Sequence, residues 1–273
     1  MAGIELSGVR QTALWNLYTR AHEAQRSDGV LTDPECVRVF EAIEYDYEGT
    51  FGTQQNGLHA EKSRIFDTVV RAWLAEHPDG TVVELGAGLE TQFHRVDNGT
   101  VSWVSVDLDE VIALREKFLP PTERQRYLAV DARDVSWFGE VGSGPVLVTA
   151  QGLFMFFREE QVRQLIVDIV DRFSDVELVF DTIAPVMSKK AMNGYDLTDK
   201  CRLPEMPWGI KRNDIPPVLR GWHPRISGVE VQSFGAVHGA LIAIRPLAFR
   251  LPVLRDILPV VAHVTTSNAA PRS

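Results

Sequence analysis

A glycine-rich turn is the clearest candidate for a ligand site. Residues 82–91 read VVELGAGLET, so a β-branched run passes through Glu84 into Gly86 and Gly88. Such a turn lets the backbone approach a ligand closely and presents N–H groups at the start of the next helix. The same turn can serve only to reverse the chain. The motif therefore predicts an α/β unit and leaves ligand binding open.

Acidic residues end the next two expected strands. The strand 101–107 ends at Asp107, about twenty residues beyond the turn, where an acid suits the ribose hydroxyls of a nucleotide. The strand 127–131 ends at Asp131, where an acid can reach an adenine amine. Either acid can instead cap a helix. A dinucleotide fingerprint would have glycine where this chain has Thr91, which disfavours an NAD enzyme.

The elements that position these residues alternate between strands and helices. Apolar strands are expected at 81–88, 101–107, 127–131, 145–152 and 176–181. Between the last two, apolar residues recur at the spacing of one helix face from Val162 to Phe173. Continuous apolar strands that alternate with helices predict an α/β fold whose parallel sheet is covered on both faces.

The segments outside this alternation suggest a lid and an insertion. Helices are expected at 7–26, from Pro34 to Ile43 and from about His59 to His77. The Pro-rich segment 182–229 is expected to be an insertion with short helices, and 230–246 to hold two final strands. We therefore expect a helical lid (1–60), a core (61–250, with the insertion at about 182–229) and a C-terminal segment and tail (251–273). The final TTSNAAPRS is read as a frayed tail.

Composition excludes several function classes. The net charge of −9 disfavours binding to phosphate backbones, so no nucleic-acid partner is expected. The N-terminus has no secretory signal and no apolar run approaches the roughly 20 residues of a membrane span, which predicts a soluble, cytoplasmic protein without a membrane partner. Cys36 and Cys201 lie outside any zinc pattern, so no metal is expected. A disulfide between them and a homo-oligomer both stay open.

Four segments in order carry a resemblance to a known family. They are VVELGAGLETQFHRV, VSVDLDEVIALREKFLP, VDARDVSWF and TAQGLFMFF, with SGVRQTALWNLYTRA before them and MPWGI after them. Together they resemble the leucine carboxyl methyltransferase family, and within it the bacterial polyketide-synthesis O-methyltransferases of the tetracenomycin type. The resemblance covers most of residues 7–210. It implies a Rossmann-like class I fold with a seven-stranded, mostly parallel sheet, and S-adenosylmethionine as the methyl donor.

The resemblance also implies roles for matching residues. In HAEKSR, Lys62 matches the base that holds the donor's methionine carboxylate, with Arg64 as the alternative. Lysine keeps the positive charge of the arginine that the family usually has here, but it lacks the planar guanidinium that binds a carboxylate through two hydrogen bonds. The other donor-binding residues implied are Glu84, Gly86, Ala87 and Gly88 for the methionine part, Asp107 and Leu108 for the ribose, and Asp131 and Ala132 for the adenine.

Two positions depart from the family pattern. Gln151 stands where relatives have an acid near the donor, so it can hydrogen-bond the donor's ammonium but offers no charge. Phe156 replaces a tyrosine near the acceptor and cannot donate a hydrogen bond. Arg133 matches a substrate-facing arginine and is the candidate for the catalytic residue that orients the acceptor. The alternative is a surface arginine paired with Asp134 or Glu140.

The acceptor itself is less well defined. Trp15, Tyr18, Phe156 and Trp208 are expected to bind an apolar acceptor. A carboxylate acceptor needs no base, whereas a hydroxyl benefits from one; the candidate bases are His22, His59, His94, His223 and His238. We expect an O-methyltransferase that modifies a carboxyl or hydroxyl group of a small molecule, such as a polyketide-type natural product in antibiotic biosynthesis. The alternatives are a carboxyl methyltransferase for protein or peptide termini and a non-catalytic fold relative.

Overall fold

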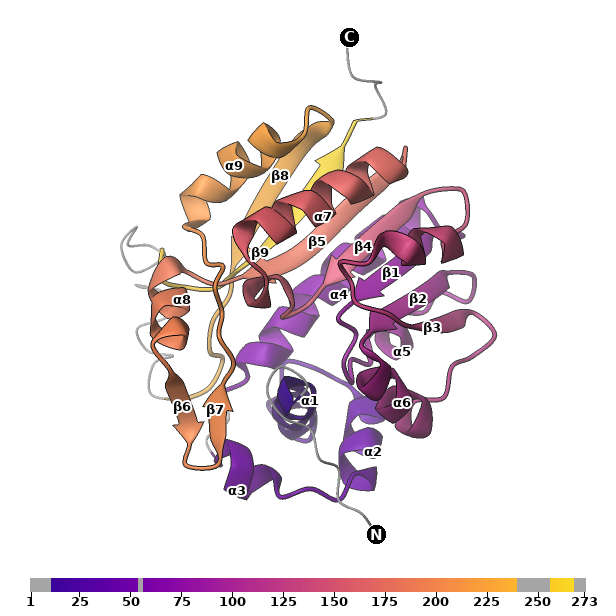
Figure 1. Ribbon diagram of the computed structural model, residues 1–273. Coiled ribbons are helices and arrows are strands. Elements are labelled where there is room, and N and C mark those ends of the chain that lie inside the picture. The colour runs from indigo at the N-terminus through magenta and orange to yellow at the C-terminus, as the bar shows by residue number, and fades with distance from the viewer. Residues whose placement is uncertain (1–10, 54–55, 240–255, 268–273) are drawn as a thin grey trace.

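The computed structural model describes residues 11–53, 56–239 and 256–267 (Figure 1). Its centre is a seven-stranded sheet in the order β3-β2-β1-β4-β5-β9-β8. The first five strands in the chain are parallel, and β9 is antiparallel to both of its neighbours. The expected Rossmann-like α/β fold is confirmed. The strands are β1 (Thr81–Leu85), β2 (Ser102–Asp107), β3 (Gln125–Ala129), β4 (Val146–Ala150), β5 (Val176–Thr182), β8 (Ile226–Ser233) and β9 (Val260–Thr266).

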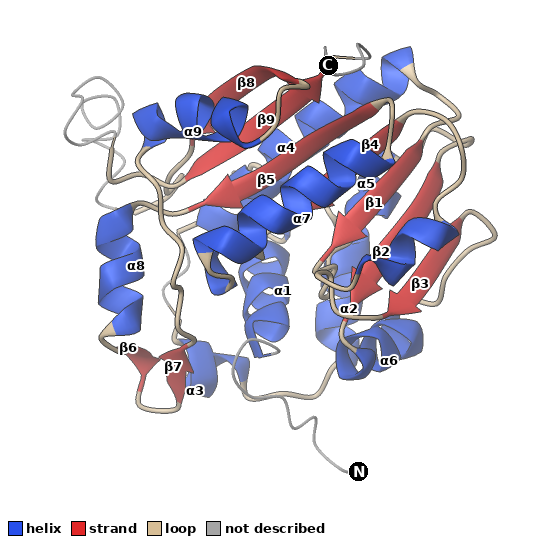
Figure 2. Ribbon diagram, turned by 45° about the horizontal axis from the view of Figure 1, so that its top comes forward, coloured by secondary structure: helices blue, strands red, loops and turns tan. Residues whose placement is uncertain are grey.

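Alternate residues of the central strands enter two different cores. In β1, Val83 packs with the helix α7 (Glu159–Arg172) and with α9 (Ile215–Trp222) on one face of the sheet. Its neighbour Val82 packs with α4 (Leu58–Glu76) and α5 (Gln92–Val96) on the other face. Figure 2 shows α7 in front of the sheet and α4 behind it. A strand buried on both faces has to be apolar throughout, which explains the continuous runs in the sequence.

Three N-terminal helices form a third core beyond the carboxyl ends of the parallel strands. They are α1 (Gln11–Ala24), α2 (Pro34–Ala42) and α3 (Tyr47–Phe51). Their apolar residues gather with Leu89 of the glycine turn and with Leu114 of α6 (Asp109–Phe118). Figure 2 places α1 and α2 below the strands that carry the turn. The helices α1 and α2, which the sequence predicted, and the short α3, which it did not, therefore lie over the end of the sheet where ligands bind in this class of fold.

The insertion after β5 contains more regular structure than we expected. It holds the helix α8 (Pro185–Met192) and the hairpin of β6 (Tyr195–Thr198) and β7 (Cys201–Leu203) before it reaches α9. Thr198 Oγ donates to the carbonyl of Thr50, and Lys200 pairs with Asp46. The hairpin is thereby joined to α3 at the base of the N-terminal helices.

The last two strands differ from the sequence prediction. The first, β8, lies at Ile226–Ser233, and residues 240–246 of the predicted segment 230–246 lie outside the described residues. The seventh strand instead comes from Val260–Thr266, so reading Thr265 as part of a tail was wrong. Thr266 Oγ donates to the carbonyl of Val176, which fastens this end of the strand to β5. Threonine is β-branched and therefore suits a strand, but its polar side chain led us to assign this segment to a tail.

A network of buried charges ties the N-terminal helices to the sheet. Arg95 of α5 contacts Asp33 at 2.5 Å, Asp67 of α4 at 2.7 Å and Glu90 at 2.8 Å. Glu90 also pairs with Arg20 of α1 at 2.7 Å. Burial alone would raise the pKa of Glu90, but the guanidinium groups of Arg20 and Arg95 lower it to about 2. Glu90 therefore stays ionised and holds both arginines.

Further features bear on the function classes considered above. No helix among the described residues is long and apolar enough to span a membrane. The described part of the chain has no cluster of His, Cys, Asp and Glu that is suited to a metal ion. Cys36 and Cys201 are both buried and both free.

The network makes a prediction about stability. Replacing Arg95 by Ala leaves three buried carboxylates without their shared cation, so the free energy of unfolding should fall by about 3–5 kcal/mol. Urea denaturation measures this change. The matched control is Arg163→Ala on the exposed side of α7, which should change the stability by no more than about 0.5 kcal/mol. Equal stability of the two variants would show that the network does not hold the fold.

Candidate functional site

The glycine turn after β1 has the conformation that the sequence indicated. Gly86 and Gly88 have φ values of 64° and 50°, in the left-handed region where glycine is favoured. A Cβ on Gly86 would lie 2.9 Å from Cδ1 of Leu153, so a side chain at this position would have to displace Leu153. The Gly86 N–H donates to the carbonyl of Val106 at 2.8 Å, which holds the turn against β2.

Asp107 lies directly beside this turn. Its carboxylate accepts the N–H of Gly88 and the N–H of Leu108, both at 2.7 Å. Burial raises the pKa of Asp107, while these two N–H groups act in the opposite direction. The side chain lines a hollow together with Gly86, Gly88 and Leu108. This is the position expected of an acid that binds ribose hydroxyls at the end of the second strand.

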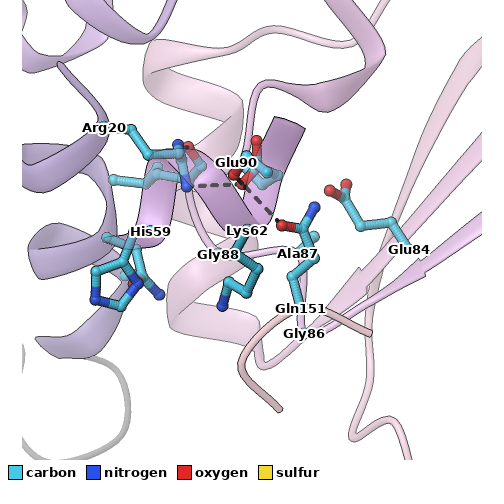
Figure 3. A pocket seen from close by; sticks show the side chains of 13 residues that line it. Arg20, His59, Lys62, Glu84, Gly86, Ala87, Gly88, Glu90 and Gln151 are labelled. Atoms are coloured by element: carbon cyan, nitrogen blue, oxygen red, sulfur yellow. Dashed lines mark hydrogen bonds and ion pairs between the residues drawn. The ribbon is translucent and has the colours of Figure 1, made fainter. Parts of the chain in front are cut away.

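A second hollow continues from the turn toward the N-terminal helices, and we call the two hollows the donor cleft. They share Ala13, Asn16, Gly86, Gly88 and Gln151. Figure 3 shows Arg20 and His59 on one side of the second hollow and Glu84 and Gln151 on the other. The Ser63 hydroxyl donates to Oε1 of Gln151 at 3.4 Å. Lys62 also lines this hollow and pairs with Asp181 at 3.3 Å.

Two buried oxygen atoms in the donor cleft lack hydrogen-bond partners among the described residues. They are Oε1 of Glu84 and Oδ1 of Asn16. The other oxygen of Glu84 accepts from Ser105 at 2.9 Å and faces Arg115 at 3.4 Å. Buried polar atoms normally have partners, so an unpaired pair of acceptors at one site indicates a ligand that donates hydrogen bonds there.

An apolar cavity of about 250 Å³ opens beside the donor cleft, and we call it the acceptor cavity. Three of the chain's five methionines line it, namely Met155, Met187 and Met206. Trp15 and Phe156 line it as well. The side chains that face both the cavity and the second hollow are all polar: Asn16, His59 and Lys62. The cavity therefore has an apolar body and a polar end that meets the donor cleft.

His59 stands at this junction without a charge. Burial, with the nearby positive charges of Lys62 and Arg20, lowers its pKa to about 3. Its ring meets Trp15 edge-on, with the centroids 4.8 Å apart. Near neutral pH His59 is therefore an uncharged hydrogen-bonding group.

Most of the predicted site residues come together in these two spaces. Trp15 and Phe156 lie in the acceptor cavity, as expected for residues that contact an acceptor. The members found in the donor cleft are Lys62, Glu84, Gly86, Ala87, Gly88, Asp107, Leu108 and Gln151. Their roles toward a ligand stay predictions.

Three predicted residues lie elsewhere. Arg64, the alternative to Lys62, is half exposed and pairs with Glu61 one turn away on α4. Tyr18 is fully buried, stacks on Tyr47 and donates its hydroxyl to the carbonyl of Gly52 at 3.0 Å. Trp208 is buried in the core beside Phe154 and Phe180. None of the three lines the donor cleft or the acceptor cavity. Tyr18 and Trp208 belong to the hydrophobic cores, and Arg64 is held at the surface by its ion pair.

Arg133 also lies away from the acceptor cavity. Its guanidinium pairs with Asp131 and lies 5.0 Å from the centre of the Phe157 ring. Both charged residues line a separate surface hollow near α7. The expectation that Arg133 faces the acceptor is not met. It is a surface arginine, paired with Asp131 two residues away rather than with Asp134 or Glu140.

The adenine-side residues stay predictions. The pairing with Arg133 lowers the pKa of Asp131 and occupies its carboxylate. The neighbouring Ala132 is buried, and its carbonyl accepts the indole N–H of Trp137 at 3.0 Å.

Sequence reasoning missed several polar residues of the site, among them Asn16, Arg20 and Asp181. Asn16 and Arg20 are four residues apart and share one face of α1. The sequence analysis considered only the apolar residues of this helix and so did not notice the polar pair. Asp181 lies near the carboxyl end of β5 and lines the acceptor cavity. The argument that singled out Asp107 and Asp131 applies equally to it and would have found it.

Comparison with known families agrees with this geometry. The model of the leucine carboxyl methyltransferase family matches residues 13–170, more than half of the chain. The chain belongs to the leucine carboxyl methyltransferase family. It is an S-adenosylmethionine-dependent methyltransferase.

Two relatives match this chain over about two thirds of their own length. The tetracenomycin polyketide synthesis O-methyltransferase TcmP of Streptomyces glaucescens is 29% identical over 185 residues, which are 67% of this chain and 68% of the relative. The S-adenosyl-L-methionine-dependent methyltransferase dpfgK of Gibberella zeae is 26% identical over 191 residues, which are 63% of this chain and 64% of the relative.

Solved structures of more distant methyltransferases share the fold. The N-methyltransferase NodS of Bradyrhizobium japonicum, in complex with S-adenosyl-L-homocysteine, gives a TM-score of 0.50 at 11% identity and covers 93% of this chain and 98% of its own. The magnesium protoporphyrin IX methyltransferase of Synechocystis, with bound S-adenosylhomocysteine, gives 0.50 at 13% identity, with 86% of this chain and all of its own covered.

The residues of the donor cleft fit S-adenosylmethionine. The two glycines of the turn carry no side chains where the backbone would approach the donor, and the unpaired oxygens of Glu84 and Asn16 can accept from its ammonium and hydroxyl groups. Lys62 lines the same cleft, and its role as the cation for the donor's carboxylate stays a prediction.

Asp107 provides the test of this placement. Replacing Asp107 by Ala removes a charged acceptor of the ribose hydroxyls, so binding of S-adenosylhomocysteine should weaken by about 1–3 kcal/mol. Titration calorimetry measures the affinity, and circular dichroism checks the fold. The neighbouring Asp109→Ala, at an exposed position on α6, should leave the affinity unchanged. An unchanged affinity in folded Asp107→Ala would place the donor elsewhere.

Proposed function

We propose that the enzyme methylates an oxygen atom, of a carboxyl or hydroxyl group, on a small and largely apolar molecule such as a polyketide-type natural product. The observation that carries the proposal is the acceptor cavity, which is apolar in its body and meets the donor cleft at a polar end. The name of the relative TcmP, a polyketide synthesis O-methyltransferase, supports the same substrate class.

The walls of the cavity favour a small molecule over a protein terminus. Its walls come from α1, α4, α8 and the hairpin that follows α8, so the acceptor has to lie between these elements. The lining contains aromatic and thioether side chains and few groups that can pair with a peptide backbone. A peptide backbone would leave its polar groups unsatisfied in such surroundings, which is unfavourable.

The chain's residues contribute mainly alignment and exclusion of water. S-adenosylmethionine, when bound, supplies a methyl group on a sulfonium, which is a good leaving group. In this proposal the turn at Gly86 and Gly88 positions the donor, and Trp15 and Phe156 cover the space in front of it. Alignment of the two reactants and removal of water are the contributions that a displacement of this kind requires.

Ligand-dependent stability tests the donor assignment. A ligand that binds only the folded state raises its stability with concentration, so S-adenosylhomocysteine should raise the Tm in differential scanning fluorimetry. NAD at the same concentration should leave the Tm unchanged, because Thr91 stands where the dinucleotide fingerprint has glycine. A shift with NAD and none with S-adenosylhomocysteine would reject the proposed function.

Labelled methyl transfer tests the acceptor class. We expect the purified enzyme with methyl-labelled S-adenosylmethionine to label aromatic molecules of two to four fused rings that carry hydroxyl or carboxyl groups. Peptides that end in leucine should receive no label, because the cavity cannot satisfy their backbone groups. Scintillation counting with mass spectrometry identifies the products. Label on the peptides alone would favour methylation of protein termini.

A further inference from the structure

One polar side chain at the junction of the two ligand spaces is not accounted for by the donor. Asn16, His59 and Lys62 face both the acceptor cavity and the second hollow of the donor cleft. Lys62 pairs with Asp181 at 3.3 Å and is predicted to bind the donor's carboxylate. The unpaired oxygen of Asn16 suits the groups of the donor that donate hydrogen bonds. His59 is therefore left for the acceptor.

The ring of His59 is held by packing. It belongs to the first turn of α4, where Oδ1 of Asn56 accepts the N–H of Leu58 at 3.1 Å. The ring meets Trp15 of α1 edge-on, with the centroids 4.8 Å apart and the ring planes inclined by 71°. The hydrogen bonds among the described residues involve neither of its ring nitrogens. The ring is thus oriented, while its nitrogens are not used by the described part of the chain.

The surroundings of His59 keep the ring uncharged. Burial lowers its pKa most, and the positive charges of Lys62 on the same helix and of Arg20 on α1 lower it further. Glu90, beyond the glycine turn, acts in the opposite direction, and the pKa is about 3. A neutral imidazole has one N–H that donates and one nitrogen that accepts. At neutral pH His59 can therefore donate a hydrogen bond, but it is a weak base.

An uncharged donor suits methyl transfer to an ionised oxygen. The attacking oxygen loses its negative charge as its bond to the methyl carbon forms. Hydrogen bonds from a cation are roughly twice as strong as those from a neutral group, so a cation would stabilise the oxygen more before the transfer than during it. Only interactions that are stronger in the transition state accelerate a reaction. A neutral N–H orients the oxygen with a smaller loss of this kind.

Resting on the proposed function, we propose that the N–H of His59 donates a hydrogen bond to the acceptor's oxygen and turns a lone pair of that oxygen toward the methyl group of the donor. The role is the same for a carboxyl and for a hydroxyl acceptor, because the oxygens of both accept hydrogen bonds. His59 then contacts the substrate and is a catalytic residue. Among the five histidines considered as bases, this one acts as a hydrogen-bond donor instead.

His59 keeps its own proton throughout the transfer. With a carboxylate, a lone pair of one oxygen forms the bond to the methyl carbon, and the electrons of the carbon–sulfur bond stay on sulfur. The products are a methyl ester and S-adenosylhomocysteine, and no proton moves. With a hydroxyl, the same two bonds change, the O–H proton passes to water, and the product is a methyl ether.

Two variants of similar size test the hydrogen bond. His59→Gln keeps an N–H donor, whereas His59→Met has none. The probes are 2-naphthoate and 2-naphthol, with methyl-labelled S-adenosylmethionine at saturation. The kcat of His59→Met should fall roughly tenfold to a hundredfold, and that of His59→Gln should stay within about fivefold of the native value. An equal loss in both variants, or no loss in His59→Met, would overturn the role of His59.

A purely structural role predicts a different result. In that case the Tm and the affinity for S-adenosylhomocysteine would fall together with kcat, whereas we expect both to be unchanged in the two variants. The matched control is His22→Met, because the ring of His22 packs on Tyr18 and Phe40 and lines neither ligand space. It should leave kcat unchanged. If His59→Met does not fold, His59→Phe keeps a flat ring beside Trp15 and should show the same loss of kcat.

The pH dependence separates a hydrogen-bond donor from a base. The ratio of the native kcat to that of His59→Gln cancels the ionisation of the acceptor and of all groups that the two enzymes share. With its pKa at about 3, His59 stays neutral between about pH 5.5 and 7.5, so this ratio should change less than about twofold. A base with the ordinary histidine pKa of ~6.5 would become protonated as the pH falls, and the ratio would drop roughly tenfold over this range. Such a drop would overturn the proposal.

The native enzyme distinguishes the two levels of failure. If it does not bind S-adenosylhomocysteine, or methylates neither probe, the proposed function fails and the role of His59 fails with it. If it binds this ligand and methylates a probe while His59→Met keeps the native kcat, only the role of His59 fails.

Discussion

The ion pairs that Glu90 makes with Arg20 and Arg95 are the interaction on which the rest of the structure depends. Glu90 follows the glycine turn by two residues, while its partners come from α1 and from α5. The same Arg95 reaches Asp33 before α2 and Asp67 in α4. One buried acid thus connects the turn that receives the donor with the helices that cover it. Removing any partner would leave an uncompensated buried charge, so these elements keep a fixed relative position.

This connection explains how a helix outside the sheet contributes to both ligand spaces. Through Arg20, α1 is held at the turn, and the residue one helical turn earlier, Asn16, is thereby placed between donor cleft and acceptor cavity. Trp15, the residue before Asn16, lines the acceptor cavity but not the donor cleft. The N-terminal helices are therefore a structural wall of the site, stabilised by the same charges that order the turn.

Features that depend on neighbours in the sequence were predictable, and features that depend on tertiary packing were not. The glycine turn, Asp107 and the five parallel strands follow from local pattern, since a parallel sheet brings strand ends together whatever surrounds them. Tyr18 and Trp208 were misplaced because aromatic type does not reveal whether a side chain faces a core or a cavity. The pairing of Lys62 with Asp181 joins residues 119 positions apart, so no local signal in the sequence indicates it.

The two halves of the site differ in how readily they deform. The donor half is backbone: glycines in the left-handed region, held by hydrogen bonds to β2 and by a carboxylate. The acceptor half has methionines in its walls, and their unbranched, polarisable side chains adapt to irregular shapes. Substitutions among Met155, Met187 and Met206 can therefore reshape the space for the acceptor while the backbone that grips the donor stays the same. A chain built in this way is suited to evolutionary change of its acceptor, because new ring systems can be accommodated by side chains that carry no part of the fold's charge network.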